Sequence, residues 1–202
     1  MPDTNQLFDN MLRAAKERLA DHDPLEIAKN ACVEFTGDSF RLMSFGRKVC
    51  ISFPDFDISP ELPQWHTLSL LHYLDLADGF PAGNKQMPFA AYRDGMVRGG
   101  GFDRDAEKFI ENKLGHLDEA LLAQRCLALG GALIPSNADL CARFDFAPCY
   151  PLWLKIWFAD DEFPASGRLF VSETADHYLT IEDAVTVGSV LFDLLADANI
   201  SV

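Results

Sequence analysis

Residues 140–158 read LCARFDFAPCYPLWLKIWF and contain the strongest strand patterns of the chain. From Leu140 to Phe146, apolar residues alternate with Cys, Arg and Asp, which is typical of a strand. Residues 152–158 are apolar on both faces except for Lys155, which indicates a strand in the middle of a sheet. The connection between the two strands is short, which favours antiparallel pairing.

Weaker patterns extend the fold on both sides of this pair. They predict a hairpin over 40–53 that turns at Gly46, and a strand over 167–172. Helical spacing of apolar residues predicts helices over 4–19, 24–32, 63–77, 103–115 and 117–129, and a last one capped by Thr180 and Asp183. Strands cluster and do not alternate with helices. We therefore expect an α+β fold, a single domain over 1–202 with a mainly antiparallel sheet and flanking helices.

Two details of the helices follow from local signals. Asp23 and Pro24 are expected to begin the second helix, with Leu25, Ala28 and Cys32 on its buried face. Segment 80–101 reads as a loop with a short strand over 88–93, and Asp103 is expected to cap the helix after it.

The triple glycine at 99–101 ends this expected loop. A phosphate-binding loop is excluded there, because Phe102 and Asp103 follow where Lys and Ser or Thr are needed. The glycines are therefore expected to form a flexible turn before the helix.

Charge and hydropathy exclude several classes of protein. The chain has 202 residues, 17 Lys and Arg, 31 Asp and Glu and a net charge of −14, so it repels nucleic acid. The acids concentrate in 158–202, which predicts a solvated face, a surface for a basic partner protein or a cation site. The start is polar, and the longest charge-free apolar run, about 13 residues, is shorter than the ~20 that span a bilayer. We expect a cytoplasmic protein without membrane contact.

The five cysteines form no C-x-x-C pair, which favours reduced thiols over a disulfide framework or a zinc or iron–sulfur site. Cys149 is expected to be the most exposed thiol, and His177 is the histidine that could activate it. His66 and His72 lie about 120° apart around one predicted helix and cannot hold one metal ion together. Each is expected to be a partly buried, hydrogen-bonded side chain.

Two unusual runs near the carboxyl end are the candidate site. In the first, Trp157 precedes Asp160, Asp161 and Glu162, and in extended geometry Asp160 and Glu162 face the same side, which suits Mg²⁺ or Ca²⁺. The alternative is an acidic turn in solvent, with one carboxylate capping backbone N–H groups.

In the second run, His177 and Tyr178 precede the predicted cap of the last helix. They could donate protons beside a carboxylate. The alternative is structural, with the run serving to start the helix.

Taken in order, the two runs resemble the C-terminal signature of an uncharacterised prokaryotic family, domain-of-unknown-function family 3786. Weaker matches extend the resemblance over essentially the whole chain: Asp23-Pro24, 45–47, 70–74, Phe80-Pro81 and 89–93. The resemblance implies an origin largely among anaerobes, and some relatives carry an added four-cysteine iron–sulfur module of the type seen in corrinoid proteins. This chain lacks such a cysteine cluster.

Together these features lead us to expect an accessory or ligand-binding protein rather than an enzyme, linked to cofactor or corrinoid metabolism in anaerobes. Its ligand, a small molecule or cofactor, would lie among Trp157, Asp160, Asp161, Glu162, His177 and Tyr178. One alternative is a metal-assisted enzyme with Asp160 and Glu162 as ligands and His177 as acid or base. Another is an acidic adaptor for a basic protein. The first two readings require the two runs to converge.

Overall fold

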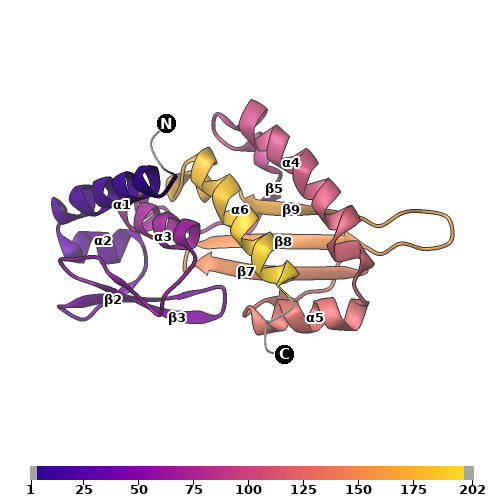
Figure 1. Ribbon diagram of the computed structural model, residues 1–202, viewed down its shortest axis with the longest axis horizontal. Helices are drawn as coiled ribbons and strands as arrows, with labels where there is room; N and C mark the ends of the chain where they lie inside the picture. Colours follow the sequence, from indigo (N-terminus) through magenta and orange to yellow (C-terminus); the bar gives the residue numbers. More distant parts are fainter. Residues whose placement is uncertain (1–3, 198–202) are drawn as a thin grey trace.

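The computed structural model describes residues 4–197 and contains a larger and a smaller antiparallel sheet (Figure 1). The larger sheet has the strand order β5-β9-β8-β7-β6, and β8 lies at its centre as predicted. In the β7–β8 pair, Cys141 lies opposite Lys155. The strands are β5 (Gln86–Met87), β6 (Ala132–Leu133), β7 (Leu140–Ala147), β8 (Tyr150–Trp157) and β9 (Ser166–Ser172).

The smaller sheet contains the predicted hairpin and has the order β1-β2-β3-β4. Its strands are β1 (Glu34–Phe35), β2 (Ser39–Ser44), β3 (Arg47–Ser52) and β4 (Ile58–Ser59). The hairpin turns at Phe45 and Gly46, and Gly46 has a φ of +73°. The Phe45 N–H donates to the Asp145 carbonyl on β7 at 3.0 Å, so the turn joins the two sheets.

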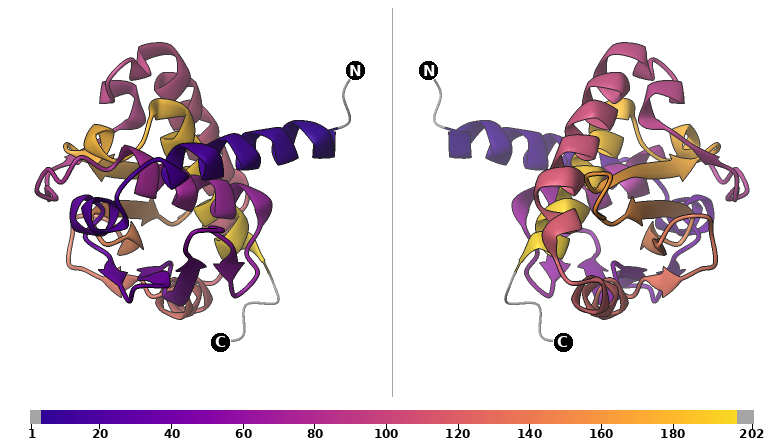
Figure 2. Two further views of the ribbon diagram at one scale, coloured as in Figure 1. Left: turned by 90° about the vertical axis from the view of Figure 1, so that its left-hand side faces the viewer. Right: turned by 90° about the vertical axis from the view of Figure 1, so that its right-hand side faces the viewer.

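Six helices pack against these sheets within the described range. They are α1 (Thr4–Ala20), α2 (Pro24–Asn30), α3 (Gln64–Leu76), α4 (Gly95–Asn112), α5 (Glu119–Ala128) and α6 (Ile181–Ala196), with short 3₁₀ turns η1 (Phe89–Ala91), η2 (Leu114–His116) and η3 (Ala175–His177). Helix α6 crosses the larger sheet between α3 and α4 (Figure 1). Helix α1 packs on α3 through an Arg18–Asp75 ion pair of 2.7 Å, and its N-terminal part extends beyond the body of the protein (Figure 2).

A single hydrophobic core runs through both sheets, which confirms the α+β prediction. At the junction of the sheets, the rings of Phe45 and Phe146 lie 5.5 Å and 5.7 Å from His66 on α3. His66 is buried and bonds to the Ser44 hydroxyl at 2.7 Å, as expected for a structural histidine. Across residues 4–197, every helix is too short or too polar to cross a bilayer.

The expected loop over 80–101 is wrong in its second half, because α4 begins at Gly95 and includes the triple glycine. Gly95 and Gly99 lie one turn apart against η1. A Cβ atom there would lie 2.4 Å and 2.1 Å from the Phe89 carbonyl oxygen, so only glycine allows this approach.

Asp103 does not begin α4 but lies within it. Its carboxylate accepts the N–H groups of Phe89 and Ala90 at 3.1 Å and 2.9 Å, and so holds η1. This turn occupies the place of the strand predicted over 88–93.

Helix α2 begins as predicted, since the Asp23 carboxylate accepts the Leu25 N–H at 2.8 Å. The expected buried face is wrong at two positions. The Leu25 side chain is 66% exposed, and Cys32 is exposed beyond the helix end with a φ of +55°. The helix stops at Asn30, since a positive φ cannot continue it.

Candidate functional site

The two runs expected to converge lie at opposite ends of β9. Residues 158–165 form the long loop between β8 and β9, at the far right of Figure 1, whereas 173–180 follow the other end of β9. A seven-residue strand separates its ends by roughly 20 Å. The expectation that Asp160, Glu162 and His177 surround one hollow is therefore wrong.

In the acidic run, the Asp160 carboxylate stabilises the loop that contains it. The Asp160 carboxylate accepts the N–H groups of Glu162 and Phe163 at 2.8 Å and 2.7 Å, and these bonds lower the pKa of Asp160. Asp161 and Glu162 are exposed. Within residues 4–197, no three His, Cys, Asp or Glu side chains are grouped closely enough to hold a metal ion.

Trp157 lies at the base of this loop. Its indole N–H donates to the Asn137 carbonyl at 3.1 Å, which ties the end of β8 to the segment before β7. Trp157 therefore lies near the acidic loop but far from His177 and Tyr178.

His177 and Tyr178 fasten the segment after α3 to η3. His177 Nδ1 lies 2.7 Å from the Asp78 carboxylate, which lowers the pKa of Asp78, and its ring stacks on Phe80 with centroids 3.9 Å apart. The Tyr178 hydroxyl donates to the Phe80 carbonyl, and its ring stacks on Tyr73 at 5.6 Å. Both side chains therefore have structural contacts, but to the segment after α3 and to Tyr73. The expected start of the last helix is provided by Thr180 and Asp183 alone.

A different region contains the larger hollows. Two adjoining depressions of about 780 Å³ and 540 Å³ flank the outer side of α6, one against α4 and the other against α3 and α1. They share several lining residues and form what we call the α6 groove. The residues that line it include Trp65 and His72 of α3, Val97, Arg98 and Gly101 of α4, and Glu182, Asp183, Val185, Ser189 and Asp193 of α6.

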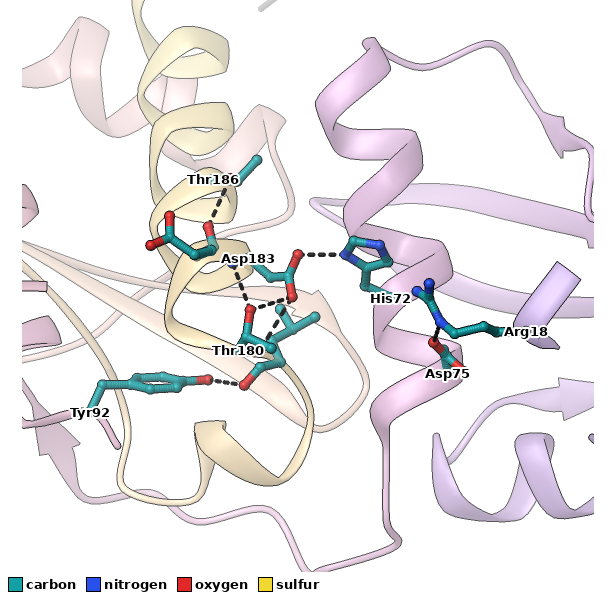
Figure 3. Close-up of polar contacts among 9 residues, drawn as sticks. Arg18, His72, Asp75, Tyr92, Thr180, Asp183 and Thr186 are labelled. Carbon is teal, nitrogen blue, oxygen red and sulfur yellow. Dashed lines mark hydrogen bonds and ion pairs between the residues drawn. The ribbon is translucent and has the colours of Figure 1, made fainter. Parts of the chain in front are cut away.

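The start of α6 is held from two sides at this groove. The Asp183 carboxylate lies 2.5 Å from Nδ1 of His72 and also closes the predicted capping box with Thr180 (Figure 3). Burial favours a raised pKa for Asp183, but the hydrogen bonds from His72 and Thr180 outweigh it and leave the pKa lowered. The carboxylate is therefore ionised in the folded protein at neutral pH.

The α6 groove combines apolar walls with acidic groups. The Val97 side chain is 85% exposed and that of Trp65 is 46% exposed. Glu182 and Asp193 line both hollows, and Asp94 and Asp105 line the one against α4. Among the described residues, Arg98 is the one lysine or arginine that lines either hollow, and it pairs with Glu182 across α4 and α6 at 2.8 Å. The groove can accommodate an amphipathic molecule and favours a positive charge on it.

The sequence does not predict the α6 groove. Its walls come from helices far apart in the chain, and the sequence predicts a loop for the first part of α4, up to Gly101. Of the residues that line the groove, Val97 is a large apolar residue that is 85% exposed. Its exposure depends on where α4 packs, which no local pattern specifies.

These features define an α+β protein with two antiparallel sheets and a helix-lined surface groove. The chain belongs to the family described as domain of unknown function DUF3786, whose model matches residues 23–193. The matched range includes α3, α4 and the groove-lining part of α6, and thereby most of the groove. No curated protein and no solved structure matches the chain.

Proposed function

We propose that this protein is a non-catalytic binding protein that holds a small amphipathic cation in the α6 groove. The observation that carries the proposal is the combination of exposed apolar side chains with an excess of carboxylates along two adjoining hollows. The two hollows have volumes within the roughly 300–1,000 Å³ typical of small-molecule sites.

The geometry suggests how such a ligand would lie. Its apolar part would cover Val97 and Val185, which removes apolar surface from water. Its positive group would lie near Glu182, which lines both hollows. Asp193 also lines both hollows but lies about 16 Å further along α6, so it adds to the negative potential of the groove without contacting the same group. Because Arg98 is the competing cation at Glu182, a bound ligand would take over part of that ion pair.

The protein would thus have the binding role expected from the sequence, but in the α6 groove and not at the acidic loop and His177. A link to cofactor or corrinoid metabolism in anaerobes is part of the proposal and decides which natural ligands are screened. Location in the cytoplasm is likewise proposed. The adaptor alternative is addressed by the same experiment, since a basic peptide can be offered in place of the small molecule.

Gly101 provides a way to block the groove without disturbing the fold. It lines the hollow against α4, and a Cβ atom added there would meet no atom within 4 Å. Gly101→Leu should therefore fill the groove and leave the core unchanged. Lys108→Leu adds the same side chain at an exposed position of α4 outside the groove and is the matched control.

The test measures thermal shift and calorimetric binding with octylamine, octanol and octanoate, followed by corrinoids, flavins and a basic peptide. We expect saturable binding of octylamine, weaker binding of octanol and none of octanoate. Gly101→Leu should abolish octylamine binding and Lys108→Leu should retain it. Equal binding of the three probes, or unchanged binding by Gly101→Leu, would contradict the proposal. Binding of the basic peptide alone would favour the adaptor.

A further inference from the structure

Two cysteines distant in the sequence meet where the end of α2 lies against the turn between β7 and β8. The Tyr73 hydroxyl donates to the Ala31 carbonyl at 2.8 Å and accepts the Cys149 N–H at 3.1 Å. One phenol thus bridges the backbone beside Cys32 to that of Cys149. The side chains of Cys32 and Cys149 are close enough for Cys149 to raise the pKa of Cys32.

The two thiols differ in their access to solvent. Cys32 is exposed, and its φ of +55° is unusual for a residue with a side chain. Cys149 is 7% exposed, which corrects the expectation that it is the most accessible thiol. Cys149 also lies near the Tyr178 hydroxyl and raises its pKa, whereas His177 bonds to Asp78 and stacks on Phe80.

We propose that Cys32 and Cys149 form a thiol–disulfide pair, in which Cys32 reacts first with a small-molecule disulfide and Cys149 completes the internal bond. The exposed sulfur is the one that such a reagent can approach, and the sheltered sulfur lies beside it to displace the adduct. The resulting link would join the end of α2 to the β7–β8 turn. This inference does not depend on the α6 groove.

The reaction balances with the disulfide as the oxidant. The Cys32 thiolate attacks one sulfur of the reagent, forming a mixed disulfide and releasing one thiolate, which takes up a proton. Cys149 then gives up its proton and attacks the Cys32 sulfur, releasing the second thiol. The protein loses two hydrogens and two electrons, and one disulfide reagent becomes two thiols.

The electrostatics of the pair set the speed of the first step, whereas the exposure of Cys32 sets the order. The pKa of Cys32 is raised to about 11, most strongly by the interaction of its thiol with the Cys149 side chain, and further by burial and by negative charge at Cys149. Cys32 is therefore mostly the neutral thiol near pH 7, and only its small thiolate fraction attacks the reagent. We expect exchange to be slow at neutral pH and faster as the pH rises.

The test incubates the full chain with oxidised glutathione and follows the intact mass and the thiol count. We expect a mass loss of about 2 Da and the loss of two reactive thiols, both reversed by dithiothreitol. Peptide mapping should recover Cys32 linked to Cys149. Cys50→Ser, which removes another partly exposed thiol, should leave the result unchanged.

Two variants separate the steps. Cys149→Ser should stop at one glutathione attached to Cys32, whereas Cys32→Ser should form neither the adduct nor the internal link. A lasting glutathione adduct on wild-type Cys32, a link that involves Cys50, or a disulfide between two chains would overturn the proposal. If Cys149→Ser does not fold, the linked peptide of the wild-type protein decides alone.

Discussion

Nδ1 of His72 lies 2.5 Å from Oδ1 of Asp183, so a side chain of α3 holds the first turn of α6. The other carboxylate oxygen accepts the Thr180 hydroxyl at 2.7 Å and the Thr180 N–H at 3.3 Å. One side chain thus begins α6 and fixes it against the helix that forms the opposite wall of the groove (Figure 3).

Asp183→Ala should therefore destabilise the protein by about 2–3 kcal/mol, since it removes half of the capping box and the partly buried hydrogen bond to His72 together. Thr180→Ala removes only the cap and should cost about 1 kcal/mol. Urea denaturation at pH 7 measures both. Glu182→Ala is the control, because its ion pair with Arg98 is exposed and contributes at most about 0.5–1 kcal/mol. An Asp183→Ala loss no larger than that of Glu182→Ala would show that the pair does not hold α6.

The α+β architecture could be predicted because its signals are local. The alternation in 140–146, the apolar run in 152–158 and the turn at Gly46 each lie within one element and its immediate neighbours. The cap by Asp23 and the capping box of α6 are local too, and both are confirmed.

The features that could not be predicted depend on distant contacts. The start of α4 is set by the approach of Gly99 to η1, and the thiol pair by Tyr73 binding the backbone at Ala31 and Cys149. The role of an acidic run also depends on the folded backbone around it, so its sequence alone does not predict a cation site. A carboxylate such as Asp160 satisfies nearby N–H groups as readily as it binds a cation, and sequence alone does not distinguish the two.

Neighbouring glycines of α4 should respond in opposite ways to the same substitution. Gly101→Ala should stabilise the protein by about 0.5–1 kcal/mol, because the helix gains alanine's propensity and the added Cβ meets open space. Gly99→Ala gains the same propensity, but its Cβ would lie 2.1 Å from the Phe89 carbonyl oxygen. We expect the free energy of unfolding to fall by about 1–3 kcal/mol because of overpacking. Thermal and urea unfolding of both variants test this, and an equal gain from both would contradict the close packing of α4 on η1.

Asp103 should matter for η1 and not for the start of α4. Asp103→Ala leaves the N–H groups of Phe89 and Ala90 without their acceptor and should cost about 1–2 kcal/mol, with little change in helix content by circular dichroism. Asp105→Ala changes an exposed acid on the same helix and is the control. A marked loss of helix content in Asp103→Ala would restore the capping role predicted from the sequence.

The buried imidazole of His66 should make the protein sensitive to mild acid. Burial, aided by the charge of Arg47, lowers the pKa of His66 to about 4, and within the described residues its Nδ1 has no hydrogen-bond partner. Between pH 6.5 and about 4, the unfolded chain binds a proton at this residue that the folded protein does not. Stability is therefore lost as the pH falls through this window.

From pH 7.5 to pH 5, this single group should lower the free energy of unfolding by about 2 kcal/mol. His66→Gln, which can keep the bond to the Ser44 hydroxyl but does not titrate, should remove that part of the pH dependence. His116→Gln, at an exposed histidine, should leave it in place. Urea denaturation of the three proteins at both pH values provides the comparison. Because the quantity compared is the pH dependence, a general loss of stability in His66→Gln does not obscure the result, and an equal pH dependence in all three proteins would refute it.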